Sequence, residues 1–476
     1  MIRENPCGAL MRLVCVLLFM GLTIAGDAQY LRTSYFMDGA QYRLQLNPAL
    51  APTRGYIHLP AVGQTNASIH SKALGMRDVF DLLKNADDAD YYTTDRFYGD
   101  LTDRNTALAS VGTDLLSIGK WHGRGFISFN VGLRVDGSIA VSRELFTFMR
   151  DMKGLNHNDY GDYFRDMSNE ELNLNAYGEI GVGYTRLIGD RLRLGGRIKG
   201  LLGIGNVKLT VNKATVQTHL TGIEPETDWT STGLADLIHA RGTADIDVDA
   251  VLETSFKGLE LPTSSGGYIN DVSTETNKMG ISGFGGAIDL GVAVDVTNDL
   301  TLSASIVDLG FIKWSKSSTQ VAYSNSDDLS FDSNRPGDIR RFIGVVGSGK
   351  VLNWEMVRLM PDDQASKSRT TALTSTLAVG AEYRLADDKL SLGALFTNRF
   401  AKPDNESEVT FSVGVHPREL LDFAVSYSPV MSGGSSFGLA VKVGPLFVGT
   451  DYMYLGNKTK CCNALVGLSI PLGGME

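Results

Sequence analysis

Four basic side chains alternate along one short segment of the chain: Arg191, Arg193, Arg197 and Lys199. Leu192, Leu194 and Ile198 stand between them, so in a β-strand the basic and apolar side chains would lie on opposite faces. Guanidinium groups can bind carboxylates in a bidentate manner. The pattern therefore predicts either a contact for an anion or a carboxylate head group, or a row of internal ion pairs with Glu179 as a cross-strand partner.

Patterns for catalysis or metal binding are weaker. Gly434-Ser435-Ser436-Phe437-Gly438 matches the nucleophile elbow of hydrolases, but that motif requires a strand-to-helix turn, and here a loop leads into a strand. The seven histidines show no metal-ligand spacing. Asp87, Asp88 and Asp90 could hold Ca²⁺, or could simply form a solvated acidic loop. We therefore expect no enzyme activity, no metal site and no cofactor.

The strands that must position the basic row are apolar on one face only. In Leu373–Leu385, apolar residues occupy most odd positions and polar residues or glycine most even positions, and the same alternation returns through the last hundred residues. Such segments, separated by turns, are typical of a transmembrane β-barrel. Aromatic residues toward the strand ends on the lipid-facing phase predict an interfacial girdle: Tyr184, Tyr383, Phe396, Phe400, Tyr427, Tyr452 and Tyr454.

About fourteen such segments predict an all-β fold, a transmembrane antiparallel barrel over residues 55–472 with a periplasmic tail at 473–476. Short links such as Ala386–Asp388 are expected on the periplasmic side. Four long segments are expected outside the cell: Ser71–Asn105, Ser138–Glu170, Thr218–Met279 and Ser317–Ala372. Helical patterns near Met76–Lys84 and Ser142–Met152 predict short helices within them.

The N-terminus predicts export. Two arginines precede an apolar run from Leu13 to Ala25, and small residues follow, so residues 1–28 are typical of a cleaved secretory signal peptide. The run is too short for a spanning helix. The formal net charge of the chain is −10, which argues against a nucleic-acid partner. The expected location is the outer membrane, with its lipid bilayer as the first partner.

Residues 29–54 do not have the pattern of a strand. Asn47-Pro48-Ala49-Leu50-Ala51-Pro52 places two prolines within five residues, which interrupts regular pairing. A short irregular segment ahead of a hollow barrel can fill the lumen as a plug. The alternative is a disordered periplasmic tail, against which its leucines argue.

The Asn47-Pro48-Ala49-Leu50 motif, between a signal peptide and a barrel of this size, resembles the long-chain fatty-acid transporter (FadL-like) superfamily. The resemblance implies that residues 29–54 are an N-terminal hatch within the lumen and that Asn47, Pro48, Ala49 and Leu50 take part in gating. The wider stretch to Tyr56 is similar to an uncharacterised outer-membrane barrel family of Bacteroidetes-type bacteria. It also resembles the PorV and PorP/SprF-like barrels associated with type IX secretion. Residues 29–46 are short for a transporter hatch and lack its glycine-rich run.

Two functional hypotheses follow. The first is a hatch-gated channel for passive uptake of a hydrophobic or amphipathic ligand. The second is a structural or secretion-associated barrel that docks an envelope protein partner through its external loops, above all Thr218–Met279. We expect Pro48→Ala to change uptake under the first hypothesis, and loss of that loop to abolish a complex under the second.

Overall fold

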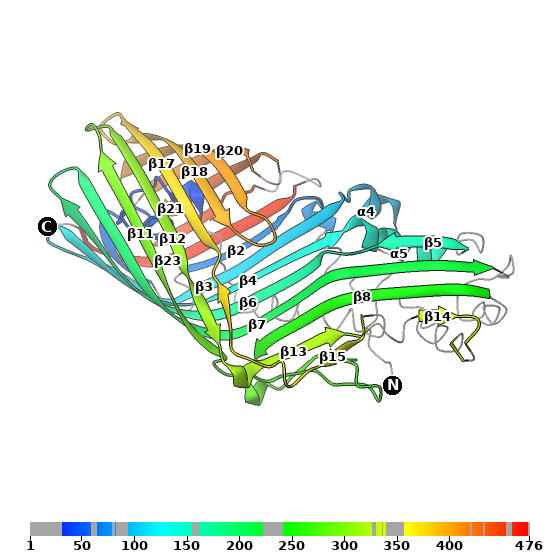
Figure 1. The fold of residues 1–476 in the computed structure, drawn as a ribbon. Coiled ribbons are helices and arrows are strands. Elements are labelled where there is room, and N and C mark those ends of the chain that lie inside the picture. The colour runs from blue at the N-terminus through cyan, green and yellow to red at the C-terminus, as the bar shows by residue number, and fades with distance from the viewer. Residues whose placement is uncertain are drawn as a thin grey trace.

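The computed structural model describes residues 31–58, 64–78, 81, 94–154, 161–221, 241–325, 330–335, 337–338, 357–418, 421–431, 434–453 and 459–474. The predicted signal peptide at 1–28 and the acidic group Asp87, Asp88 and Asp90 lie outside the described residues. Within the described residues the chain is dominated by one large antiparallel sheet that closes on itself (Figure 1).

The closed wall has 14 strands, as the sequence predicted. In order around the barrel they are β1 (Arg54–His58) together with β2 (Gln64–Ser71), β3 (Arg104–His122), β4 (Gly125–Ser142), β6 (Glu170–Ile188), β7 (Leu192–Thr221), β11 (Gly283–Asp295), β12 (Leu300–Trp314), β17 (Ser375–Leu385), β18 (Leu390–Phe400), β19 (Glu406–Arg418), β20 (Leu421–Val430), β21 (Ser436–Val443), β22 (Leu446–Thr450) and β23 (Cys461–Gly474). Both β1 and β2 pair with β23 on one side and β3 on the other, which closes the barrel.

The short connections gather at one end of the barrel. Gly123 and Gly444 stand in two of these turns at positive φ, a conformation that glycine adopts without a steric penalty. Outer-membrane barrels keep their short turns in the periplasm. We therefore name this end the periplasmic end and the opposite end the outer end.

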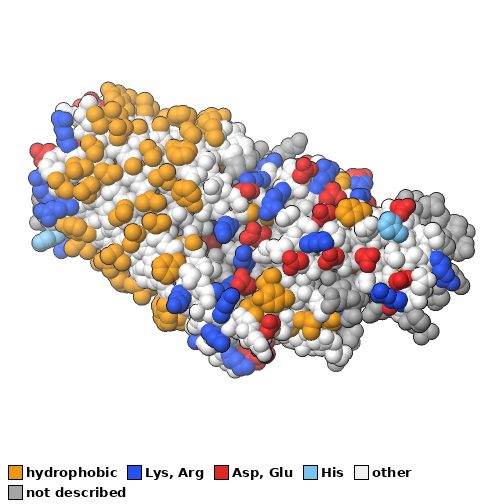
Figure 2. Space-filling view, in the orientation of Figure 1, with side chains coloured by type: hydrophobic (Ala, Val, Ile, Leu, Met, Phe, Trp, Pro, Cys, Tyr) orange, Lys and Arg blue, Asp and Glu red, His pale blue; other side chains and the backbone are white. Residues whose placement is uncertain are grey.

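A belt of exposed apolar side chains surrounds the wall near the periplasmic end (Figure 2). Ile198 on β7 is 72% exposed, and Phe284 on β11 is 64% exposed. Inward-facing neighbours on the same strands are buried and largely polar. Apolar side chains outside and polar side chains inside are the arrangement of a transmembrane β-barrel, with lipid around the belt.

The wall extends well beyond this belt at the outer end. β7 has 30 residues, roughly 100 Å at about 3.3 Å per residue, whereas the hydrocarbon core of a bilayer is about 30 Å thick. Leu194 and Ile198 are its exposed large apolar side chains, and both lie near its periplasmic end. The remaining part of β7, about two-thirds of its length toward the outer end, therefore lies outside the membrane, where Figure 2 shows charged side chains.

The prediction that Thr218–Met279 is a loop was wrong for the central part of that segment, which forms a strand. β8 (Arg241–Phe256) pairs with β7 from Gly205 to Thr221, because Ile246, Val248 and Ala250 alternate with three aspartates and can pack on one face. Further strands of the outer part are β5 (Asp162–Asp166), β9 (Leu259–Glu260), β10 (Ser273–Thr274), β13 (Thr319–Ser324), β14 (Ser330–Asp332), β15 (Leu359–Pro361) and β16 (Arg369–Ala372).

Short helices lie in the outer part, as expected. They are α4 (Asp95–Gly99), α5 (Arg143–Gly154), and the 3₁₀ turns η5 (Thr276–Lys278) and η6 (Lys316–Ser318). α5 matches the helix predicted near Ser142–Met152, while the helix predicted near Met76–Lys84 is described only at 76–78 and 81. In the described part of the chain, none of the helices combines the length and apolar character needed to cross a membrane.

Candidate functional site inside the barrel

The N-terminal segment, residues 31–53, lies inside the barrel (Figure 1, dark blue). It contains the 3₁₀ turns η1 (Arg32–Ser34) and η2 (Gln41–Gln45). From Leu31 to Leu50 every residue is buried except Asp38 and Gly39, which are half-buried. Its apolar side chains pack against wall residues in three clusters: Leu31, Met37, Ala40 and Tyr42 against β20–β23, Tyr35, Phe36, Leu46, Ala49 and Leu50 against β11, β17 and β18, and Leu44 against Tyr56 of β1 and Phe126 of β4.

The start of the segment is anchored to Asp451, which directly follows β22. The Asp451 carboxylate accepts the backbone N–H groups of Arg32 at 3.0 Å and of Thr33 at 2.8 Å. The Thr33 hydroxyl donates to the same carboxylate at 2.6 Å. The Arg32 guanidinium forms an ion pair with Glu408 and lies over the ring of Tyr452, 4.9 Å from the centroid. All these groups are buried, so the anchor replaces hydration that the segment loses on entering the lumen.

Tyr452 corrects one prediction from the sequence. It was placed in the lipid-facing girdle, but it is 2% exposed and donates to Glu408 at 2.8 Å. The alternation of inward and outward side chains does not extend to Tyr452, because β22 ends at Thr450 and the chain turns inward. Tyr184, Tyr383, Phe396, Phe400 and Tyr427 are exposed on the outer surface as predicted, and Tyr454 lies outside the described residues.

The far part of the segment is held by the predicted motif. Asn47 Oδ1 accepts the backbone N–H of Ala49 at 2.9 Å, and Asn47 Nδ2 donates to the Tyr35 hydroxyl at 3.0 Å. This side-chain turn is the local structure that Asn before Pro favours. Thr185 on β6 donates to the Pro48 carbonyl at 2.5 Å, which joins the turn to the wall.

Glycines in the wall make room for the segment. A Cβ added to Gly195 on β7 would overlap the carbonyl of Pro48, and one on Gly291 of β11 would overlap Asn47 Oδ1. Other wall glycines meet the segment in the same way: Gly380 at Tyr35, Gly393 at Phe36, Gly438 at Thr33 and Gly449 at Leu31. The neighbouring Gly196 has its nearest such contact at 3.8 Å. The segment and the wall are therefore closely packed at six glycine positions.

The predicted basic row divides into two parts. Arg193, Arg197 and Lys199 point into the lumen, whereas Arg191 precedes β7 in the turn and is exposed. Arg193 pairs with Asp295 at 2.5 Å near the periplasmic end. Lys199 is 1% exposed as a side chain and contacts Asp308 at 2.5 Å and Asp289 at 2.8 Å.

Glu179 lies in this cluster, but not at the predicted position. It was expected opposite Lys199, whereas the register pairs Glu179 with Leu201 and Gly181 with Lys199. The turn is centred one residue later than assumed, which moves the register by two and leaves Glu179 on the lumen face. Its carboxylate still reaches Lys199 Nζ at 3.9 Å and Arg134 Nη2 at 3.6 Å.

The alternation of polar and apolar residues did not predict that the carboxylates of Asp289 and Asp308 join this cluster. A bulge in β12 opposite Asp289 turns Asp308 inward at φ +59, and its backbone N–H donates to Asp289 Oδ1 at 2.7 Å. Before the bulge the odd positions of β12 face the lumen, and after it the even positions do so. The acidic residue in the middle of β12 was the available signal, but the bulge changes which face it occupies.

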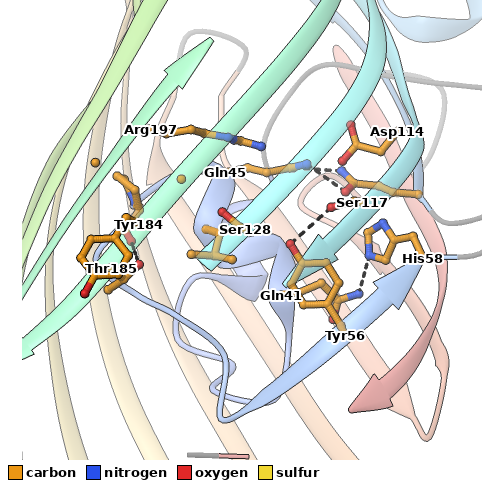
Figure 3. Close-up of a pocket in the computed structure, with 15 residues that line it drawn as sticks. Gln41, Gln45, Tyr56, His58, Asp114, Ser117, Ser128, Tyr184, Thr185 and Arg197 are labelled. Atoms are coloured by element: carbon orange, nitrogen blue, oxygen red, sulfur yellow. Dashed lines mark hydrogen bonds between the residues drawn. The ribbon is translucent and has the colours of Figure 1, made fainter. Parts of the chain in front are cut away.

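Two cavities flank this cluster. The inner cavity is small and lies between the segment and the wall toward the periplasmic end, and Figure 3 shows its lining. Its labelled residues are Gln41, Gln45, Tyr56, His58, Asp114, Ser117, Ser128, Tyr184, Thr185 and Arg197. Within it, Gln41 Nε2 lies 3.0 Å from His58 Nε2, and Ser117 donates to the Tyr56 hydroxyl at 3.3 Å. The lining is mostly polar.

The outer cavity is larger than the inner one and lies farther from the short turns. Arg32 and Leu46 of the segment contribute to it, and Asp308 connects it to the Lys199 cluster. The remaining lining residues are Arg134, Asp136, Tyr177, Thr374, Thr376, Thr397, Arg399, Glu406 and Glu408. Basic and acidic groups both line this cavity, so its surface has no uniform sign of charge.

The other motifs are placed away from these cavities. Ser436 is the first residue of β21 and pairs with Ser428, so the elbow-like motif is a loop leading into a strand, as expected. Among the described residues no group of three or more side chains is arranged to hold a metal ion. Cys461 and Cys462 are both free thiols.

A family model described as a family of unknown function (DUF5723) matches residues 48–451. No curated protein matches the sequence. Solved structures that resemble the chain include the Ralstonia pickettii toluene transporter TbuX, at 9% identity and a TM-score of 0.43, covering 95% of this chain and 100% of that one. The Pseudomonas putida toluene transporter TodX gives 10% identity and a TM-score of 0.39, covering 91% and 94%.

A Pseudomonas aeruginosa FadL homologue gives 9% identity and a TM-score of 0.29, covering 95% of this chain and 98% of that one. FadL-type channels, the superfamily that the Asn47 motif resembles, are among the solved structures to which this chain is similar.

Proposed function

The chain belongs to DUF5723, a family of unknown function, and we propose that it is a passive outer-membrane channel whose lumen is gated by the N-terminal segment. The solutes are hydrophobic or amphipathic small molecules. The observation that carries the proposal is that one segment fills the lumen and leaves a cavity on each side of the Lys199 cluster. A solute that enters from outside meets the outer cavity first and can reach the inner cavity only past this segment.

The contacts of the segment support a gate that can move. Many of its attachments are hydrogen bonds and ion pairs to the wall, including those of Arg32, Thr33 and Pro48. Water can replace such bonds, each of which contributes about 0.5–1.5 kcal/mol between neutral groups and about 1.5–3 kcal/mol where the acceptor is charged, as at Asp451. In this proposal the segment moves away from the wall as a whole, and Asn47–Leu50 takes part in gating because Asn47 and Pro48 lie against the glycines of β7 and β11.

A disulfide lock tests the gate. The Thr33 and Ser426 hydroxyl oxygens are 2.7 Å apart, which places both side chains within reach of a disulfide. We would combine Thr33→Cys and Ser426→Cys in a background that carries Cys461→Ser and Cys462→Ser. The variant is placed in liposomes, and uptake of benzyl alcohol and of sugars is measured under oxidising and reducing conditions. We expect oxidation to lower flux and reductant to restore it.

The Thr33→Cys single variant is the matched control, because it experiences the same oxidant without a partner. Equal flux through the oxidised and reduced lock would reject a gate that moves. Folding of each variant is checked by its migration on gels before and after heating.

The outer part of the barrel favours a second candidate, a barrel that docks an envelope protein. Beyond the membrane belt β7, β8 and β13 enclose an apolar core that includes Leu252, Phe256 and Ile269. Conduction alone does not require this structure. We would purify the protein in mild detergent and identify proteins that accompany it, beside a variant that lacks residues 257–279. A stoichiometric partner lost from the variant would support docking, and no partner with either protein would count against it.

A further inference from the structure

We propose that the route past the N-terminal segment runs along β3, β4, β6, β7 and β12, and that it selects small zwitterionic solutes. This inference rests on the gated channel of the proposed function and adds to it a second, polar route for small zwitterions, beside the hydrophobic or amphipathic solutes. It starts from the side chains that separate the two cavities.

Each cavity contributes one member of a single ion pair. Asp114 on β3 lines the inner cavity, Arg134 on β4 lines the outer cavity, and Arg134 Nη2 donates to Asp114 Oδ1 at 2.7 Å. Both side chains are less than 10% exposed. The partition between the cavities at this point is therefore made of side chains and not of backbone, so a change of rotamer can connect the cavities.

A second set of contacts runs beside the first. Arg197, which lines the inner cavity, donates to Asn130 at 2.7 Å, and Asn130 donates to Glu179 at 2.8 Å. Glu179 faces Lys199 at 3.9 Å, and Lys199 contacts Asp308 of the outer cavity at 2.5 Å. Polar and charged side chains thus continue from one cavity to the other across five strands, and the signs of charge alternate along the way.

The alternation determines which solutes can pass. A solute with one sign of charge would replace a favourable partner at one step and meet a like charge at the next, and burial strengthens that repulsion. An apolar solute would remove hydration from the charged groups without replacing it. A zwitterion can offer an ammonium to the carboxylates and a carboxylate to the guanidinium groups, so both ends of the solute stay paired.

The outer cavity fits this selection. Arg399 reaches Asp136 at 3.5 Å and Glu406 at 3.9 Å, which is longer than the 2.7–2.9 Å typical of a charge-assisted hydrogen bond. Thr374, Thr376 and Thr397 add hydroxyl groups. Contacts of this length are weaker than close ion pairs, so a solute that carries both signs of charge can replace one partner at each of them.

Three solutes with permanent charge or firm ionisation test the proposal in liposomes: glycine betaine as the zwitterion, choline as the cation and gluconate as the anion. We expect the protein to pass betaine faster than either of the other two. Arg134→Ala removes a side chain between the cavities, and we expect it to raise betaine flux several-fold and to admit choline. Arg369→Ala is the matched control, because Arg369 is a half-buried arginine that pairs with Glu253 at 3.3 Å in the outer part.

Asp114→Asn is the second variant, since it keeps the shape of the side chain and weakens the same ion pair. If Arg134→Ala does not fold, the betaine flux of Asp114→Asn tests whether this ion pair controls the route. The proposal would be overturned if choline or gluconate passed through the unchanged protein as fast as betaine does. It would also be overturned by unchanged betaine flux in the folded variants. The Thr33–Ser426 lock separates the two ideas: if it lowers all fluxes while these variants change nothing, the gate stands and the zwitterion route fails.

Discussion

Thr33 and Asp451 are 418 positions apart in the chain, yet the Asp451 carboxylate accepts both the backbone N–H and the hydroxyl of Thr33, at 2.8 and 2.6 Å. The same carboxylate accepts the N–H of Arg32. One side chain at the end of β22 therefore fixes the first turn of the N-terminal segment in the lumen. A single substitution at Asp451 can therefore test the anchor.

We expect Asp451→Ala to detach the start of the segment. The change leaves buried donors on Arg32 and Thr33 without their acceptor, at a cost of about 1–3 kcal/mol. Proteolysis of the segment in detergent should become faster, and solute flux should rise. Asp404→Ala is the control, since Asp404 is 37% exposed as a side chain and pairs with Lys72 outside the segment. Equal behaviour of the two variants would mean that Asp451 is not an anchor.

The wall glycines give a second prediction. Gly195→Ala should displace the Asn47–Pro48 turn, because the new methyl group overlaps the Pro48 carbonyl. Gly196→Ala serves as the matched control on the same strand, with its nearest contact at 3.8 Å. We expect higher leak conductance in planar bilayers for Gly195→Ala alone. Identical conductance of both variants would show that the segment does not depend on this close contact.

A third prediction concerns the two roles of Asn47. Asn47→Asp keeps the oxygen that accepts from Ala49 and loses the amide that donates to Tyr35, whereas Asn47→Ala loses both. We expect Asn47→Ala to increase flux more than Asn47→Asp does. Combining each change with Tyr35→Phe in a double-mutant cycle measures the coupling between the two side chains. No coupling in the cycle would contradict a contact that holds the turn.

The outer part of the barrel yields a pH dependence. Glu170 accepts the backbone N–H of Ser142 at 2.8 Å and its hydroxyl at 2.5 Å, just before α5. Burial raises the pKa of Glu170 to about 7, above its usual value near 4.5. An acid with a raised pKa in the folded state favours folding at low pH, and this contribution is lost as pH rises from about 4.5 toward 7.

We therefore expect α5 to become more mobile between pH 5 and pH 8. A spin label at position 144, in the first turn of the helix, reports this mobility. Glu170→Gln is neutral at every pH and should abolish the change. A pH response that persists in Glu170→Gln would assign it to another group.

The barrel was predictable because its information is local. Period-two alternation and turn residues determine which segments are strands. In β17, Leu377, Val379 and Tyr383 all lie on the outward face, as their odd positions predict. β8 was missed although Asp245, Asp247 and Asp249 alternate with apolar residues. Its high content of aspartate resembled a solvated loop, and only pairing with the long β7 reveals the strand.

The interior was less predictable because it depends on irregularities. The bulge at Asp308 reverses the inward face of β12, and the end of β22 turns Tyr452 into the lumen. Neither follows from alternation. The partner of Lys199 similarly depends on a turn whose centre the sequence places with an error of one residue, enough to shift the register by two.

The most direct measurement of the central claim is solute flux through a variant that lacks residues 31–53. The variant and the full chain would be placed in liposomes at equal protein content, after heat-dependent gel migration has shown that both barrels are folded. If the segment closes the lumen, sugars and glycine betaine will enter through the variant many times faster than through the full chain. Equal flux through the two folded barrels would show that the segment is not the barrier, and would contradict the gate.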